Sequence, residues 1–305
     1  MKSKPKTMRF TMLRPIVDAI ARKHTGDACV AIDAALLTVP ERIRNKRGKL
    51  VPSHWHRDLR KLAEVLRGGR PAFGIFAQGN SKLPFVSFSS LPGIGFCPGA
   101  GACISYCYSY RAWRYPAAFA RQCQNAYLLQ TPAGRTAILQ ALDRYRKLAT
   151  ADARLDFRLY VDGDFGSVAD VEFWQVALIA RPWLKAYGYS KSWSELLAYA
   201  GPWAPNYELN LSSGSLHDDA TRALVNALPI ARGDFIAVPM PAGYHVTSSM
   251  HGDREHQARL REAFAATGDT RKAFTCPGKC GACTPKGHAC GSDRFRNIPI
   301  IIAVH

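Results

Sequence analysis

Residues 156–180 read DFRLYVDGDFGSVADVEFWQVALIA, and their pattern predicts one strand followed by one helix. The short apolar run Asp156–Val161 is typical of a strand, whereas helical periodicity begins near residue 168 and continues to about residue 180. Ser167 lies three residues ahead of Asp170, which is a typical start signal for a helix. This stretch therefore predicts a β/α unit.

Similar units follow one another along the chain from about residue 83. The other predicted strands are Pro84–Ser89, Lys185–Tyr189, Glu208–Leu211, Phe235–Val238 and Ile298–Val304. The other predicted helices lie near residues 116–130, 133–149, 192–200 and 217–228, with start signals at Pro116, Thr131, Ser190 or Ser192, and Ser215.

Repeated strand–helix units require parallel strands joined by right-handed crossovers, so an α/β fold with a partial or complete β/α barrel is expected. An open doubly wound sheet is the alternative. No Gly-x-Gly-x-x-Gly follows a predicted strand and no Gly-x-x-x-x-Gly-Lys-Ser/Thr occurs, so nucleotide-binding motifs give that alternative no support.

The composition describes a globular protein. The chain has 305 residues, of which 47% are hydrophobic, and this is enough for one large or two modest domains and excludes a disordered chain. No uncharged apolar run of about eighteen residues occurs, and the start of the chain leads into no signal-peptide core. We therefore expect a cytoplasmic protein without a membrane partner.

The charge is strongly basic and unevenly distributed. Lys and Arg number 41 against 23 Asp and Glu, which gives a net charge of +18. Residues 1–70 contain 17 of these cations and 6 of the acids, so +11 of the charge lies there. Such a charge predicts a polyanionic partner, with DNA or RNA first, whereas the alternative is that it only aids solubility or reflects a basic host.

The basic part is predicted to be separate from the rest. Residues 1–80 are predicted to form a basic, mainly helical N-terminal extension, and residues 81–305 a cysteine-rich domain with the β/α fold. Within the extension, Pro40–Lys49 predicts an exposed basic loop, because Asn45 and Gly48 disfavour a helix. An amphipathic helix, His54–Arg67, is predicted after it.

Seven of the nine cysteines fall into two close groups: Cys97, Cys103 and Cys107, and Cys276, Cys280, Cys283 and Cys290. Close-set cysteines in a reducing compartment are more often metal or cluster ligands than disulfides. The Cys-x3-Cys-x2-Cys-x6-Cys spacing of the second group favours an iron–sulfur loop, although four thiolates would also bind zinc. One or two clusters, of the 4Fe–4S type, are expected. The first group offers three ligands, which would leave one iron open to a substrate or cofactor.

The first group resembles the cluster loop of radical S-adenosylmethionine enzymes, because it follows the first strand of the predicted barrel and Tyr106 precedes Cys107. That superfamily usually has Cys-x3-Cys-x2-Cys, whereas this loop is Cys-x5-Cys-x3-Cys. The resemblance implies a barrel of the radical-enzyme type and S-adenosylmethionine as a cofactor. It also implies that an acidic residue at Asp162 or Asp164 would contact the amine or ribose of that cofactor.

A second resemblance covers most of residues 84–304. The series CPGAGACISYCYSYRAWR, FRLYVDGDFGS, KAYGYSKSW and LNLSSGS, together with the late cysteine group, is similar to the phage and mobile-element family called gene product 88. This resemblance leaves the first 80 residues outside the family. It implies a phage, prophage or plasmid origin and an iron–sulfur protein with a radical-enzyme-like barrel, and it implies no settled reaction.

Polar residues follow several predicted strands, at the end where the active site of a β/α barrel lies. The candidate catalytic residues are Asp162, Asp164 and Lys191, and the candidate cofactor-binding residues are Arg111, Ser190, Asn210 and Ser212. The structural alternatives are a turn and helix cap for the two aspartates, and surface cations for the lysine and arginine.

Two functions remain open from the sequence. The first is an enzyme whose first cysteine group binds S-adenosylmethionine or a related molecule and acts on nucleic acid or a nucleotide. The second is a protein without catalysis, in which iron–sulfur clusters or zinc stabilise a nucleic-acid-binding or redox-sensing fold.

Overall fold

The computed structural model describes residues 5–93, 95–150, 153–247, 250–281, 283–284 and 287–304, with the backbone alone for residues 5–10 and 251. The helices are α1 (Pro5–Ala21), α2 (Thr25–Thr38), α3 (His54–Leu66), α4 (Pro116–Leu129), α5 (Pro132–Asp143), α6 (Val168–Ile179), α7 (Trp193–Leu197), α8 (Asp219–Asn226) and α9 (Arg254–Ala265). The short 3-10 helices are η1 (Ala102–Tyr106), η2 (Tyr108–Arg114), η3 (Arg146–Leu148), η4 (Met250–Gly252), η5 (Ala289–Gly291) and η6 (Asp293–Phe295). The strands are β1 (Arg42–Arg44), β2 (Leu50–Pro52), β3 (Phe76–Ala77), β4 (Val86–Phe88), β5 (Leu155–Leu159), β6 (Leu184–Ser190), β7 (Tyr207–Ser212), β8 (Ala231–Val238), β9 (Phe274–Thr275) and β10 (Ile300–Ala303).

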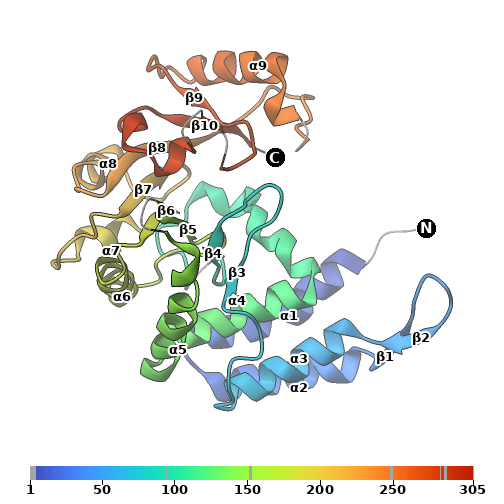
Figure 1. The fold of residues 1–305 in the computed structure, drawn as a ribbon. Coiled ribbons are helices and arrows are strands. Elements are labelled where there is room, and N and C mark those ends of the chain that lie inside the picture. Colours follow the sequence, from blue (N-terminus) through green and yellow to red (C-terminus); the bar gives the residue numbers. More distant parts are fainter. Residues whose placement is uncertain are drawn as a thin grey trace.

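Eight strands form one sheet in the order β3-β4-β5-β6-β7-β8-β10-β9, flanked by helices (Figure 1). β3 pairs antiparallel with β4, and all other neighbours in the sheet are parallel. From β4 to β8 the spatial order repeats the chain order, as expected for strands joined by crossovers to their nearest neighbour. A doubly wound sheet would reverse its order at an internal strand, so that alternative does not describe this fold. The predicted α/β class is confirmed.

The elements agree closely with the sequence-based prediction, since all six predicted strands and all six predicted helices are present. β8 begins at Ala231 rather than at Phe235, and α5 ends at Asp143, with η3 after it. The expected start signal at Ser215 is wrong for α8. Its N-cap is Asp218, whose side chain accepts a hydrogen bond of 2.8 Å from the third backbone N–H of the helix.

The two faces of the sheet are covered by different parts of the chain. On one face, helices α4–α8 pack against strand residues such as Ala186 and Leu209 in the largest apolar core. On the other face, Tyr187 and Tyr189 of β6 pack against residues between 274 and 300, which carry the second cysteine group. Successive side chains of a strand point to opposite faces, which explains why Ala186 and Tyr187 belong to different cores.

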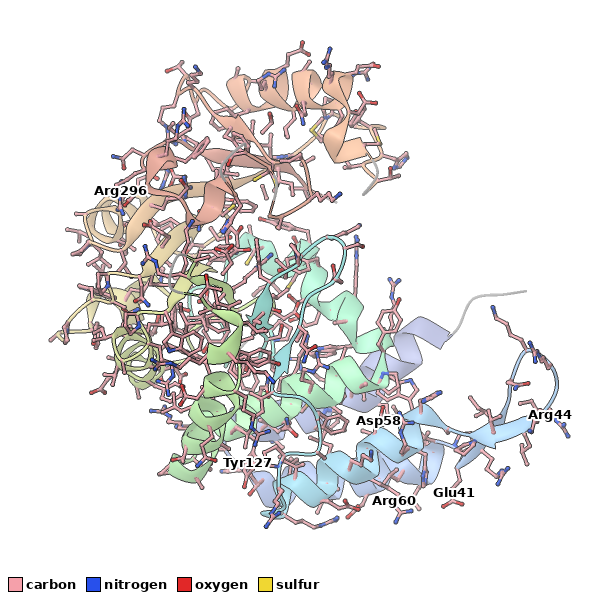
Figure 2. All side chains as sticks on the ribbon, in the orientation of Figure 1. Glu41, Arg44, Asp58, Arg60, Tyr127 and Arg296 are labelled. Carbon is pink, nitrogen blue, oxygen red and sulfur yellow. The ribbon has the colours of Figure 1, made fainter. Side chains whose placement is uncertain are left out.

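Helices α1–α3 share a second apolar core with α4, which includes Ile16, Leu62 and Phe119. Next to them, β1 and β2 pair antiparallel as a hairpin that extends away from the helices (Figure 1). Residues 41–50 are all exposed, as predicted, but they form this hairpin rather than an irregular loop. Figure 2 shows Arg44 towards the far end of the hairpin.

The division of the chain into residues 1–80 and 81–305 stays a prediction. β3 precedes the proposed boundary and pairs with β4, which follows it. In the part of the chain that the structure describes, no helix has both the length and the apolar character needed to span a bilayer.

Candidate functional site

The first cysteine group, Cys97, Cys103 and Cys107, follows β4, the first strand of the parallel set. Its loop lies against the residues that follow β7: Leu216 N–H donates to the Gly99 carbonyl (3.0 Å), and Gly101 N–H donates to the Gly214 carbonyl (3.1 Å). A Cβ atom on Gly99 would lie 1.5 Å from the Lys191 carbonyl oxygen, so only glycine permits this close approach. The loop is thereby held at the C-terminal ends of β6 and β7.

Two thiols of this group, Cys97 and Cys103, lie in an environment that disfavours their charged forms. Burial raises the pKa of Cys97, and the nearby carboxylate of Asp164 raises it further. Burial also raises the pKa of Cys103, and the ammonium group of Lys191 opposes this increase at both thiols. Charge on Cys107 raises the pKa of both neighbours, so its sulfur lies within electrostatic range of theirs.

Three predicted site residues lie together beside these thiols. Lys191 Nζ donates a hydrogen bond to Ser212 Oγ (2.7 Å), which joins the ends of β6 and β7. The carboxylate of Asp164 accepts from the backbone N–H of Lys191 (2.7 Å) and of Phe165 (2.8 Å). Burial raises the pKa of Asp164 despite these donors. The arrangement places one ammonium and one carboxylate next to the first cysteine group.

The other predicted residues are placed differently. Burial raises the pKa of Asp162, which accepts hydrogen bonds from serine and glutamine side chains and follows β5. Ser190 is buried and its Oγ accepts from Ser192 N–H (3.0 Å). Arg111 lies exposed on η2. Asn210 belongs to the surroundings of the second cysteine group, because its amide donates to the Cys290 carbonyl (2.9 Å). The functional roles of all these residues stay predictions.

The second cysteine group consists of Cys276, Cys280, Cys283 and Cys290, and every pair of its thiols lies within electrostatic range. Burial raises the pKa of Cys276 to about 12 and that of Cys290 to about 11. Two backbone N–H groups point at sulfur: Gly278 N–H donates to Cys276 Sγ (3.4 Å) and Ala289 N–H donates to Cys283 Sγ (3.4 Å). Four thiols thus lie in one segment, within electrostatic range of one another, and two of its amides donate to their sulfurs.

This segment is attached to the sheet by backbone hydrogen bonds. Cys276 N–H donates to the Ile301 carbonyl (2.8 Å) on β10, and Cys280 N–H donates to the Lys82 carbonyl (2.8 Å) ahead of β4. Gly281 has a φ of 92°, and a Cβ atom there would lie 2.9 Å from Pro84 Cγ. Glycine is therefore needed both for the conformation and for the contact with the chain before β4.

Two buried groups that support this segment are absent from the sequence-based list. Arg232 is fully buried on β8 and donates to Asn210 Oδ1 (2.5 Å) and to the carbonyl groups of Phe295 (2.7 Å) and Ile298 (2.9 Å). His288 packs against the Tyr187 ring with the centroids 4.4 Å apart. The available signal for Arg232 was a cation inside an otherwise strand-like run, ARGDFIAV.

The donor chemistry of both groups fits iron–sulfur clusters, which are held by cysteine thiolates and tuned by N–H groups directed at sulfur. The nine cysteines form no disulfide. Among the described residues, no three His, Cys, Asp or Glu side chains form a group that could hold a metal ion. The fit to a cluster therefore rests on the chemistry of the thiols and on their grouping, and not on a ligand geometry.

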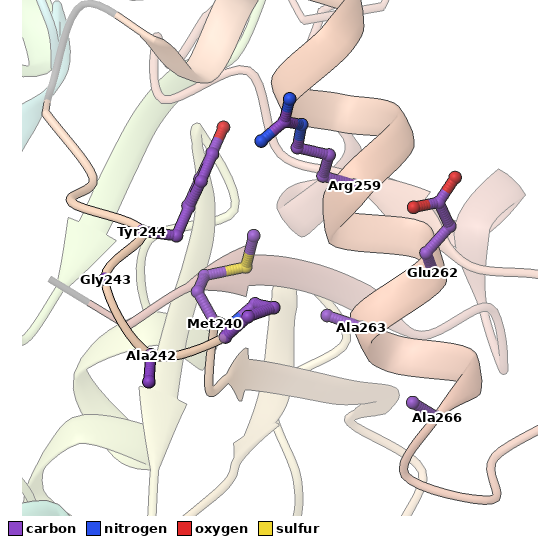
Figure 3. Close-up of a pocket in the computed structure, with 9 residues that line it drawn as sticks. Met240, Ala242, Gly243, Tyr244, Arg259, Glu262, Ala263 and Ala266 are labelled. Carbon is purple, nitrogen blue, oxygen red and sulfur yellow. The ribbon is translucent and has the colours of Figure 1, made fainter.

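A separate groove of about 660 Å³ lies between α9 and the loop that follows β8 (Figure 3). The Arg259 guanidinium lies over the Tyr244 ring, 5.2 Å from its centroid, at one wall of this groove. Met240 and Ala263 contribute to its apolar surface. Among the described residues that line it, there is no cysteine and no predicted site residue.

A family model described as gene product 88 matches residues 61–297, which is more than three quarters of the chain. The chain belongs to the gene product 88 family. The match begins within α3, so the gene product 88 region includes about twenty residues that the sequence resemblance had left outside. Both cysteine groups and all the predicted site residues lie inside it. No match to the chain was found among curated proteins or among solved structures.

Proposed function

We propose that this gene product 88 protein is an iron–sulfur protein with two cluster sites. The observation that carries the proposal is the grouping of four thiols, Cys276, Cys280, Cys283 and Cys290, each within electrostatic range of the other three. These four would hold a closed 4Fe–4S cluster, with the amides of Gly278 and Ala289 directed at its ligands. Zinc in place of iron is the alternative for this group.

The first group would hold a second cluster through Cys97, Cys103 and Cys107, with one iron free of protein ligands. An enzyme of the radical S-adenosylmethionine type, built on a partial barrel, is the activity that we propose for this site. The chain-ordered strands β4–β8 and the position of the group after the first parallel strand support this proposal. When bound, the cluster would supply an electron and a binding position for the cofactor.

The residues of the chain have separate roles in this proposal. Lys191 would offset the negative charge of the cluster and its ligands, and Ser212 fixes its ammonium group at 2.7 Å. Asp164 holds the turn after β6 through the N–H of Lys191, so that the lysine backbone stays against the cysteine loop. These roles differ from those of a protein that uses clusters for stability or redox sensing alone, which is the alternative proposal.

The proposed partner is nucleic acid in a phage, prophage or plasmid context, with the protein in the cytoplasm. The net charge of +18 supports this choice, because a polyanion is the partner that such a charge attracts. In the enzyme proposal nucleic acid or a nucleotide is the substrate, and in the alternative proposal nucleic acid is only bound.

The test is anaerobic purification followed by iron, sulfide and zinc analysis and by electron paramagnetic resonance before and after addition of S-adenosylmethionine. Two double variants distinguish the two cluster sites. The first combines Cys97→Ser with Cys103→Ser, and the second combines Cys276→Ser with Cys283→Ser. Each should lose about half of the iron. The spectral change on addition of S-adenosylmethionine should disappear in the first variant alone.

Cys29→Ala is the matched control, because Cys29 is a core cysteine in α2 outside both groups. It should keep the full iron content. Stoichiometric zinc without iron in the unaltered protein would reject the iron–sulfur proposal. Iron without a spectral response to S-adenosylmethionine would reject the enzyme and leave the alternative proposal.

A further inference from the structure

We propose that the β1–β2 hairpin inserts into the major groove of duplex DNA. This inference rests on the proposed nucleic-acid partner. It adds which element of the protein binds, which groove it enters, and that the duplex is DNA. It does not depend on either cluster site.

The hairpin has no apolar core of its own. Every residue from Glu41 to Leu50 is exposed, and no residue of β1 or β2 belongs to an apolar core. It is joined to the body at its base, where Ser53 N–H donates to the Glu41 carbonyl (2.7 Å). An exposed element of this kind is typical of a surface that binds a partner.

Cations dominate the hairpin. Between residues 41 and 50 the charged residues are Arg42, Arg44, Lys46, Arg47 and Lys49 against Glu41, a net charge of +4. In the strand register Arg42 faces Pro52 and Arg44 faces Leu50, so both arginines lie on one face of the ribbon. Each donates one hydrogen bond to a carbonyl within the hairpin, which leaves most of the five N–H donors of each guanidinium for a ligand.

The tip of the hairpin is already ordered. Asn45 Oδ1 accepts hydrogen bonds from the backbone N–H groups of Arg47 (2.9 Å) and Lys49 (3.1 Å). Gly48 has a φ of 71° and its N–H donates to the Asn45 carbonyl (3.0 Å), which closes the turn. Lys46 and Arg47 are therefore presented by a fixed turn, and little backbone freedom is lost when they bind.

The dimensions of the hairpin match the major groove of duplex DNA. Three paired residues in each strand give a ribbon about 10 Å long. The major groove of B-form DNA is about 12 Å wide and admits a two-stranded ribbon, whereas the major groove of an RNA duplex is too deep and narrow to be entered. α3 begins two residues after β2, and its His56 Nε2 lies 3.8 Å from Glu41 Oε1 at the base of the hairpin. The exposed Arg60, labelled in Figure 2, follows His56 by one helical turn. Arg60 is thus positioned to contact the phosphates beside the groove.

The experiment measures binding of the full-length protein to a fluorescent 20-base-pair DNA duplex and to an RNA duplex of the same sequence, across a salt series. The arm variant, named after the protruding β1–β2 hairpin, combines Arg44→Gln and Arg47→Gln. The control combines Arg146→Gln and Lys147→Gln, two exposed cations of η3, so both variants lose the same charge.

We expect the arm variant to bind the DNA duplex roughly tenfold more weakly than the unaltered protein, and the control variant to change by less than twofold. The slope of log binding constant against log salt concentration should become shallower by about two in the arm variant. The RNA duplex should bind roughly tenfold more weakly than the DNA duplex. Equal binding of the two duplexes, or equal losses in both variants, would overturn groove insertion and leave the nucleic-acid partner standing.

Absence of binding to either duplex at about 0.1 M salt would overturn both the nucleic-acid partner and this inference. Arm-dependent binding to phosphatidylserine vesicles or to polyglutamate, without binding to DNA, would identify another polyanion and would also overturn the inference.

Discussion

Glu208 of β7 is a partly buried carboxylic acid next to Arg296. Burial raises its pKa from 4.5 to about 7, although the guanidinium of Arg296 opposes the increase. Between these two values the folded protein binds a proton that the unfolded chain releases. This residue therefore makes the folded state less stable as the pH rises from about 5 to about 8.

Glu208→Gln should remove this dependence. The unfolding free energy of the unaltered protein should fall by up to about 3 kcal/mol across the interval, and that of the variant should change less. Urea unfolding at pH 5, 6, 7 and 8 measures both, with Glu172→Gln on the exposed side of α6 as the control. Parallel pH profiles for the unaltered protein and Glu208→Gln would contradict the assignment.

At the scale of single residues, the sequence identified which residue types form the sites better than it identified their contacts. The grouping of cysteines is visible in their spacing, and Asp164, Lys191 and Ser212 were expected together because each follows a neighbouring parallel strand. Asn210 illustrates the limit. It lies two residues before Ser212 on the same face of β7, but further from the strand end, where its amide donates to the Cys290 carbonyl of the second cysteine group.

Helix α8 shows how an element is defined by its first turn. Asp218 caps it with an oxygen 2.8 Å from the N–H of Thr221, and its charge is also favourable at the N-terminus of a helix. Asp218→Ala should lower the melting temperature of the protein, whereas Asp218→Asn should keep most of the stability. Thermal unfolding of the two variants compares them, and equal losses would show that the cap is not the cause.

Element prediction succeeded where burial is periodic. In α3 the apolar residues Leu59, Leu62 and Leu66 were expected on one face, and all are buried. It failed for β3 and β9, because strands of two residues have no period to detect. α9 was also not predicted, since only His256, Leu260 and Phe264 of its residues are buried in a mostly polar helix.

The whole molecule has a sheet with helices on one side and a cysteine-bearing segment on the other. If the second cluster holds that segment in place, Cys276→Ser with Cys283→Ser should uncover the Tyr187 face of the sheet. Backbone hydrogen exchange followed by mass spectrometry should become faster in peptides from residues 274–303 and from β6. Peptides from α5 and α6 should change little, because their core lies on the other face.

Cys29→Ala serves again as the control and should leave all these peptides unchanged. Faster exchange spread evenly over the molecule would show that the segment and the helical side unfold together. Unchanged exchange would show that the hydrogen bonds to Lys82 and Ile301 hold the segment without a cluster.

The position of β10 between β8 and β9 has a consequence for the order of assembly during synthesis. β4 to β8 can each add to a strand that the ribosome has already released, because their spatial order is their order of translation. β9 is synthesised before β10 but pairs only with β10, so it stays unpaired until β10 has been synthesised. The cysteine segment lies between these two strands in the sequence, and it therefore meets a sheet whose other strands are already in place.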